Sequence, residues 1–223
     1  MNFIFMLTRQ DQTVSDCLPV FDAIRPLGLQ HVGFKDIGAD PQTLIALNRH
    51  IKASGATSYM EVVSTSREST LESARHAVEI GVDRLMGGTF VEETLSILAS
   101  TGIEYYPFPG TPVGHPTDLR GDAAQVAAHC REFLDRGCAG VDLLAYRAVE
   151  AEPLDLVRAA RAAMGERGRL ICAGSVNSPE RIRALRDAGC DAFTIGSAAF
   201  DGSFSPRKGL LNSQLRDILA ALD

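Results

Sequence analysis

The feature that most constrains this chain is a recurring pattern in which an amphipathic segment ends at a glycine and a β-rich run follows within a few residues. Glycine suits the position after a helix because it adopts the left-handed conformation without steric cost. Seven junctions of this kind occur, at Gly28, Gly55, Gly81, Gly102, Gly137, Gly165 and Gly189. They separate eight strand-like runs, so the chain reads as a series of strand-helix units.

The eight β-rich runs are 3–7, 31–35, 58–63, 84–88, 104–108, 140–145, 170–173 and 192–195. The segments between them have helical periodicity and helix start signals. Three of these signals are a capping residue followed by a first-turn proline: Asp40 with Pro41, Ser178 with Pro179, and Ser205 with Pro206. Thr65 with Glu68 adds a predicted capping box.

Strict alternation of strand and helix indicates parallel strands. Eight units predict a single (β/α)8 barrel over residues 1–223, because such barrels need roughly 200 residues or more. An open doubly wound sheet is the structural alternative. The even spacing of the units and the lack of G-x-G-x-x-G after the first run favour closure.

The composition and net charge of the chain argue against two classes of binding partner. Hydrophobic residues make up 45% of the chain and the formal net charge is −6, with no sustained run of either sign. We therefore expect neither nucleic acid nor an anionic membrane surface as a partner. The apolar stretches are shorter than the roughly 20 residues of a membrane span, and the first residues lack a signal-peptide pattern, so a cytoplasmic location is expected.

The ends of the seventh and eighth runs carry the strongest chemical signal. The seventh leads into Gly174 and Ser175, and the eighth into Gly196 and Ser197. Glycine at a strand's carboxyl end lets an anion approach backbone N–H groups, and these two loops of a (β/α)8 barrel frequently form a phosphate site. The alternative is that the glycines only make tight turns.

Residues 171–200, ICAGSVNSPERIRALRDAGCDAFTIGSAAF, resemble the closing quarter of the phosphate-binding TIM barrels. This superfamily includes the histidine-biosynthesis isomerase and cyclase, ribulose-phosphate 3-epimerase and the N-acylmannosamine-phosphate epimerases. The resemblance implies that Gly174, Ser175, Gly196 and Ser197 hold a substrate phosphate. The histidine-biosynthesis enzymes carry catalytic aspartates after strands one and five, where this chain has none, so that activity is not expected.

A weaker repeat relates the two halves of the chain. Residues 72–89 align with 180–197, including the pairs Gly81 with Gly189 and Asp83 with Asp191. If this reflects a duplicated half-barrel, the loops 64–66 and 87–89 would form a second anion site. The alternative is that the serines of 64–66 simply cap the next helix.

Charged residues within the strands are candidates for chemistry. Side chains alternate between the two faces of a strand, so Val32 and Phe34 facing the helices turn Lys35 into the barrel. The same test turns Glu61 and Asp142 inward. Buried charges need partners, so we expect Lys35, Glu61 and Asp142 to form one network, either catalytic or a structural plug of the barrel.

Two mechanisms suit a lysine beside a carboxylate. A desolvated neutral amine would form a Schiff base with a carbonyl, as an aldolase requires. Alternatively, the ammonium stabilises an enediolate while Glu61 moves a proton. No metal site or resident cofactor is predicted, although Asp36, Glu61 and Asp142 supply oxygen ligands that suit Mg²⁺.

Loops add further candidates. Thr8, Arg9 and Asp11 follow the first strand and Arg147 follows the sixth, where an arginine would clamp a carboxylate or a second phosphate. The long connection 107–121 is a predicted lid, and His115 within it is a candidate acid-base group or a surface histidine.

Together these features predict an enzyme acting on a small phosphorylated carbonyl or sugar compound, as an isomerase, an epimerase or a lyase. The alternative is a regulatory barrel that binds a phosphorylated metabolite without turning it over. Barrels of this size often self-associate, so a homo-oligomer remains open.

Overall fold

Eight parallel strands form the centre of the computed structural model, which describes residues 1–222. Their order in the sheet is β10 (Gly140–Leu143), β11 (Arg169–Cys172), β12 (Ala192–Ile195), β1 (Asn2–Met6), β4 (His31–Lys35), β5 (Thr57–Val62), β6 (Arg84–Gly87) and β7 (Glu104–Tyr106). Each of the eight predicted runs overlaps one of these strands.

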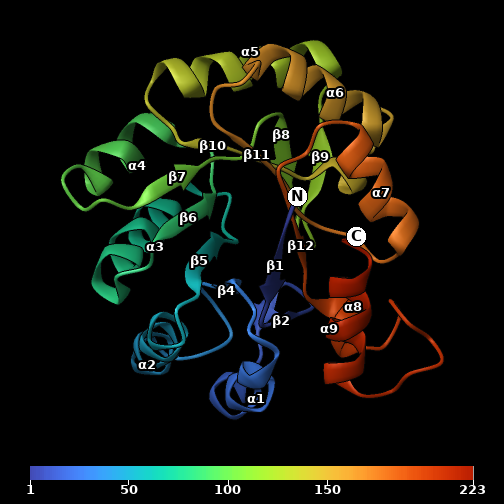
Figure 1. Cartoon of the computed structure of the whole chain (residues 1–223). Coiled ribbons are helices and arrows are strands. Elements are labelled where there is room, and N and C mark those ends of the chain that lie inside the picture. The colour runs from blue at the N-terminus through green and yellow to red at the C-terminus, as the bar shows by residue number, and fades with distance from the viewer. Residues whose placement is uncertain (223) are drawn as a thin grey trace.

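The two outer strands of this order, β7 and β10, close the sheet. The Ala139 N–H donates to the Tyr105 carbonyl and the Asp142 N–H to the Pro107 carbonyl, each at 3.0 Å. Helices surround the ring on its outside (Figure 1). The predicted (β/α)8 barrel is therefore confirmed.

The outer layer consists of α1 (Cys17–Ile24), α2 (Pro41–Ala53), α3 (Arg67–Ile80), α4 (Val91–Leu98), α5 (Ala123–Asp135), α6 (Pro153–Met164), α7 (Pro179–Asp187), α8 (Ser197–Phe200) and α9 (Leu211–Ala220). Two short 3-10 helices, η1 (Arg25–Leu27) and η2 (Ala145–Arg147), lie in the connections.

Two of the predicted helix starts are correct and two are wrong. Asp40 accepts from the Thr43 N–H and Ser178 from the Arg181 N–H, so both residues cap their helices. At α3 the cap is Ser66, one residue after the predicted Thr65, because the chain enters the helix later. Ser205 begins no helix: its N–H donates to the Gln214 side chain, so this turn packs on α9 instead.

The core has two parts, as alternation along the strands requires. A large cluster lies between strands and helices and includes Val32, Phe34 and Met60. A small cluster fills the barrel and consists of Ile4, Met6, Tyr59, Met86, Tyr106, Ile171 and Ala192. Each large apolar side chain buried in this way stabilises the fold by about 1.5–3 kcal/mol, so both faces of the strands hold the barrel together.

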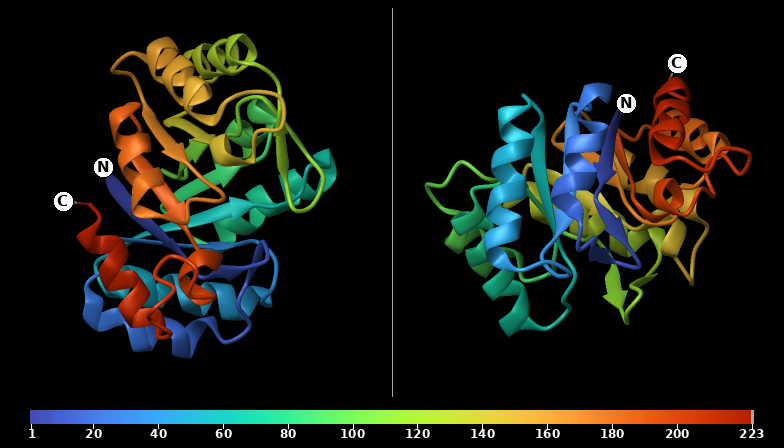
Figure 2. Two further views of the ribbon diagram at one scale, coloured as in Figure 1. Left: turned by 90° about the vertical axis from the view of Figure 1, so that its right-hand side faces the viewer. Right: turned by 90° about the horizontal axis from the view of Figure 1, so that it is seen from below.

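Two antiparallel hairpins stand at the carboxyl ends of the strands. β2 (Thr8–Arg9) pairs with β3 (Gln12–Thr13), and β8 (Thr111–Val113) pairs with β9 (Asp118–Arg120). The predicted lid 107–121 is therefore built around the β8–β9 hairpin, which projects from the end of the barrel opposite the N-terminus (Figure 2). This end carries the candidate site.

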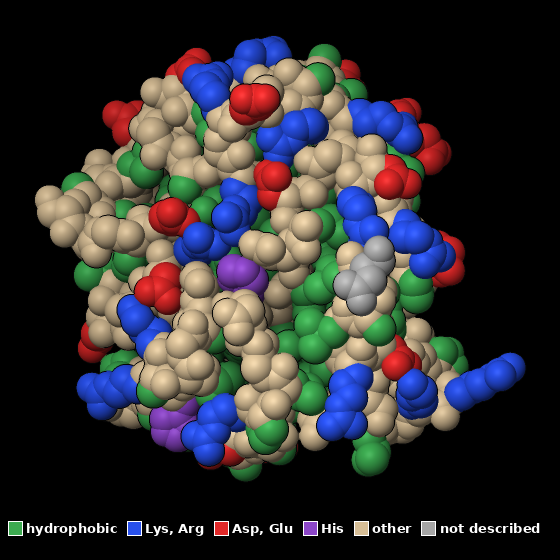
Figure 3. All heavy atoms as spheres, viewed as in Figure 1, with side chains coloured by type: hydrophobic (Ala, Val, Ile, Leu, Met, Phe, Trp, Pro, Cys, Tyr) green, Lys and Arg blue, Asp and Glu red, His purple; other side chains and the backbone are tan. Residues whose placement is uncertain are grey.

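The molecular surface agrees with the balanced composition. On the face that Figure 3 shows, Lys and Arg side chains alternate with Asp and Glu, without an extended patch of one sign. Within the described part of the chain, no helix combines the length and the apolar character that crossing a membrane requires.

Candidate active site

A cavity of about 330 Å³ opens at the carboxyl ends of the strands. The ends of β1, β4 and β5 form one side of it, and the loops after β11 and β12 form the other. Lys35 and Glu61 lie on the first side, and Gly174, Ser175, Gly196 and Ser197 on the second. The cavity thus brings together the two sets of residues that the sequence singles out.

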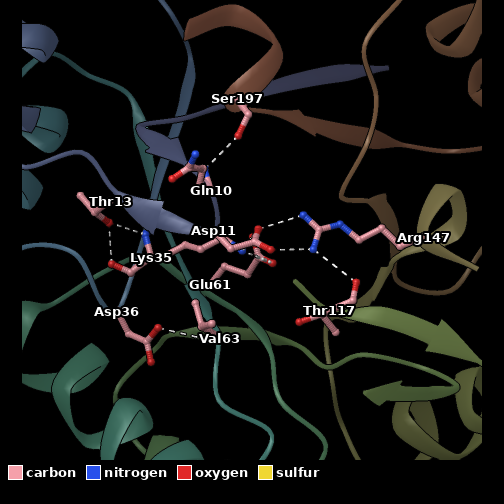
Figure 4. Close-up of polar contacts among 10 residues, drawn as sticks. All are labelled: Gln10, Asp11, Thr13, Lys35, Asp36, Glu61, Val63, Thr117, Arg147 and Ser197. Atoms are coloured by element: carbon pink, nitrogen blue, oxygen red, sulfur yellow. Dashed lines mark hydrogen bonds and ion pairs between the residues drawn. The ribbon is translucent and has the colours of Figure 1, made fainter. Parts of the chain in front are cut away.

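Four charged side chains form a chain of ion pairs in this cavity (Figure 4). The Lys35 ammonium donates to Asp11 Oδ1 at 3.0 Å and lies 3.2 Å from Glu61 Oε1. Arg147 grips the same Asp11 carboxylate with two nitrogens, each at 2.8 Å. The Lys35, Asp11 and Glu61 side chains are only 7 to 8% exposed. Charges of opposite sign therefore alternate along the cavity wall.

This arrangement determines protonation states. Burial disfavours the charged form of Lys35, but the carboxylates of Glu61 and Asp11 outweigh it and raise the lysine pKa above its ordinary value. Burial also acts to raise the pKa of Asp11, but the hydrogen bonds and charges of Arg147 and Lys35 hold it well below its usual range. At neutral pH Lys35 is an ammonium and Asp11 a carboxylate.

Asp142 differs from its predicted role in the network. The side chain is fully buried, and within residues 1–222 neither carboxyl oxygen has a hydrogen-bond partner. Burial and the charge of Glu61 raise the pKa of Asp142 well above its usual value, which favours the neutral acid. It lies inside the barrel without lining the cavity, and the expectation that it would be ion-paired with Lys35 is wrong.

Asp11 reaches the network through a tight turn. Gln10 and Asp11, the two residues between β2 and β3, have φ angles of +49° and +59°, as in a type I′ turn. Such conformations are uncommon for residues other than glycine, and Asp is one of the residues that tolerate them. Thr13 ties the hairpin to β4, because its hydroxyl donates to the Lys35 carbonyl and accepts from the Lys35 N–H, both at 2.8 Å. The turn and the network therefore support each other.

Sequence reasoning noted Asp11 only as a residue after the first strand and gave it no role. The signal that would have drawn attention to it is the polar turn Gln10–Asp11 between two short extended segments, where a type I′ turn favours Asn or Gly.

The glycines of the two predicted phosphate loops make room for protein groups. A Cβ on Gly174 would collide with the Arg147 side chain, and one on Gly196 would collide with the Thr8 hydroxyl. Three neighbouring amides remain without a partner: within residues 1–222 no acceptor takes the N–H of Ser175, Val176 or Asn177. These residues line the cavity, so their N–H groups are available to a ligand.

Of the other predicted site residues, some line the cavity and some do not. Thr8 is buried and lines the cavity, whereas Arg9 on the opposite face of the hairpin is exposed and does not. His115 is exposed at the tip of the β8–β9 hairpin, and its neighbour Pro116 lines the cavity instead. Arg147 also donates to the Thr117 carbonyl at 3.3 Å, which fastens this hairpin to the network.

The geometry supports neither the second anion site expected at loops 64–66 and 87–89 nor a magnesium site that includes Asp36. The loops 64–66 and 87–89 do not line the cavity: Ser66 caps α3, and a Cβ on Gly87 would meet Phe108 at 2.9 Å. The Asp36 carboxylate turns away from Lys35 and accepts from the Val63 N–H at 3.1 Å (Figure 4). Within residues 1–222 no three His, Cys, Asp or Glu side chains are grouped to hold a metal ion.

No protein-family model matches this chain, and no curated protein matches it in sequence. Solved structures share its fold. A structure described as native KDPGal has a TM-score of 0.68 at 15% identity, and the match covers 100% of this chain and 96% of that chain. The orotidine 5′-phosphate decarboxylase of Pyrococcus horikoshii OT3 has a TM-score of 0.65 at 13% identity, covering 96% and 99%.

A cube-shaped, porous protein cage designed by fusing symmetric oligomeric domains matches with a TM-score of 0.69 at 16% identity, over 100% of this chain and 73% of that one. At these identities the likeness is one of fold. The chain is thus similar in architecture to (β/α)8 barrels, one of which is a decarboxylase.

Proposed function

We propose that this protein is an enzyme that moves a proton next to the carbonyl group of a small phosphorylated sugar-like compound, as an isomerase or an epimerase does. Lys35 is the cation that stabilises the enediolate oxygen, and Glu61 removes and returns the proton. The observation that carries the proposal is Lys35 held between two carboxylates at the wall of the cavity.

The protonation state of Lys35 favours this chemistry over a Schiff base. A Schiff base forms from the neutral amine, which requires a lowered lysine pKa. Here Glu61 and Asp11 raise the pKa of Lys35. Two of its three N–H groups point to these carboxylates, and the third has no acceptor within residues 1–222. That third N–H supplies the hydrogen bond to a substrate oxygen.

The opposite wall supplies the phosphate anchor. Residues 175–177, whose N–H groups have no acceptor within residues 1–222, and Ser197 line this wall of the cavity. Oriented backbone amides bind phosphate without requiring a lysine or arginine. The name of one structural neighbour, an orotidine 5′-phosphate decarboxylase, also includes a phosphorylated compound. A substrate held in this way extends from the phosphate loops to Lys35.

The experiment is a solvent-exchange assay. Small aldose and ketose monophosphates are incubated with the protein in D₂O, and loss of the C–H signal next to the carbonyl is followed by proton NMR. We expect exchange with at least one compound. Lys35→Met should slow it by about 10²–10³-fold and Glu61→Gln by about 10²–10⁴-fold.

Arg9→Ala is the matched control, because Arg9 is an exposed cation on the same hairpin that does not line the cavity. It should exchange like the wild type. Binding without exchange of any compound would point to a regulatory barrel. Borohydride trapping of substrate on Lys35 would replace the proton-transfer mechanism with a Schiff-base one.

A further inference from the structure

We propose that the site selects compounds whose only anionic group is the phosphate, and that Asp11 determines this selectivity by occupying Arg147. The inference rests on the phosphate anchoring proposed above and concerns the other end of the substrate. Phosphorylated polyols, aldoses and ketoses are then accepted, and phosphorylated sugar acids are rejected.

Arg147 is the group that would recognise a carboxylate, and it is already occupied. Guanidinium binds carboxylates through two parallel N–H bonds. Both bonds are made to Asp11, at 2.8 Å each, and one of the nitrogens also donates to the Thr117 carbonyl at 3.3 Å. A carboxylate on the substrate would have to displace Asp11, which would then lie buried without its main partner.

Two cations hold the Asp11 carboxylate in its place beside Arg147, so a ligand carboxylate does not displace it. Its carboxylate also accepts from the Lys35 ammonium at 3.0 Å, so a ligand would have to replace it at two cations. The hairpin that carries Asp11 is also fixed to the barrel, because the Thr13 hydroxyl donates to the Lys35 carbonyl and accepts from the Lys35 N–H, both at 2.8 Å.

The charges that line the cavity also disfavour a second anionic group on the ligand. The lining contains three carboxylates, those of Asp11, Glu61 and Asp201, and only two cations, Lys35 and Arg147. The phosphate is offset by amide N–H groups rather than by a free cation. A carboxylate on the ligand would meet Asp11 beside an arginine that is already paired with it, and like charges of this kind exclude wrong ligands.

The test compares two ligands of equal length, a sugar-alcohol monophosphate and the phosphorylated aldonate in which the terminal CH₂OH is a carboxylate. Isothermal titration gives the dissociation constant of each. We expect the wild type to bind the alcohol at least about tenfold more tightly, the scale on which unpaired or like charges discriminate between ligands.

Asp11→Asn removes the charge and suits the turn, because Asn tolerates positive φ. It releases Arg147, so the aldonate should gain about tenfold or more in affinity relative to the alcohol. Asp118→Asn is the matched control: it removes one exposed negative charge from the β8–β9 hairpin, outside the cavity lining, and should leave the ratio of the two constants within about threefold.

Equal or tighter binding of the aldonate by the wild type would overturn the inference, as would an unchanged ratio in folded Asp11→Asn. The wild-type ratio is decisive even if that variant does not fold. Binding of neither compound would instead remove the phosphate anchoring, and the selectivity with it, so the two failures are distinguishable.

Discussion

The guanidinium of Arg147 and the carboxylate of Asp11 form a bidentate ion pair, with both N–O distances at 2.8 Å, across 136 positions of sequence. The pair joins η2, after β10, to the hairpin after β1, and the Thr117 carbonyl on the same arginine adds the β8–β9 hairpin. The Arg147 side chain thus holds both hairpins over the mouth of the barrel. It stabilises the fold in addition to balancing the charge of Asp11.

Replacing Arg147 should therefore destabilise the fold. Arg147→Met removes one of the two cations that pair with the Asp11 carboxylate, whose side chain is 8% exposed, and leaves Lys35. We expect a loss of about 3 kcal/mol in the free energy of unfolding, near the lower end for a broken buried ion pair. Urea unfolding measures it. The exposed Arg9→Met should change stability by no more than about 0.5 kcal/mol, and an equal loss in both variants would contradict the account.

Asp142 should make stability fall as pH rises. Burial and Glu61 raise its folded-state pKa well above the unfolded value, so the native state retains a proton that the unfolded chain releases. From about pH 4 upward to the folded pKa, wild type should lose about 1.4 kcal/mol per pH unit relative to Asp142→Asn, which does not titrate. Urea unfolding from pH 4 to 8 tests this, and parallel curves for the two proteins would contradict it.

For Asp11 we expect the opposite dependence of stability on pH. Arg147 and Lys35 lower its pKa in the folded state, so its contribution to stability is present above the ordinary aspartate pKa and is lost as pH falls below that value. Asp11→Asn should therefore be less stable than wild type at neutral pH, with the gap closing on acidification from about pH 4 downward. A gap that is constant down to pH 2 would show that the aspartate charge is not the cause.

Gly174 should not tolerate a side chain. It has a φ of +78°, and an added Cβ would collide with Arg147. Gly174→Ala should cost the roughly 1 kcal/mol of a left-handed alanine plus the displacement of Arg147, about 2–3 kcal/mol in all. Gly28→Ala is the control, because Gly28 has a φ of +64° with open space around it. Equal losses in unfolding free energy would mean that contact with Arg147 is unimportant.

The barrel and part of the site were predictable because they depend on local pattern. Glycine-terminated helices between β-rich runs indicate (β/α)8 architecture, and alternation along β4 and β5 turns Lys35 and Glu61 inward whatever the loops do. The Asp11–Arg147 pair was not predictable, because it joins two distant loops and depends on a turn with positive φ. Asp142 was predicted to face inward, but its isolation from the ion pairs depends on three-dimensional packing.

The central claim is that Lys35 acts as a permanent ammonium, and a nitrogen-15 NMR titration of the lysine Nζ signals tests it most directly. Comparison of wild type with Lys35→Met assigns the signal. We predict that Lys35 keeps its charge beyond the ordinary lysine pKa of about 10.4, because Glu61 and Asp11 raise its pKa despite burial. A Lys35 signal that loses its proton near or below neutral pH would contradict the account and restore Schiff-base chemistry.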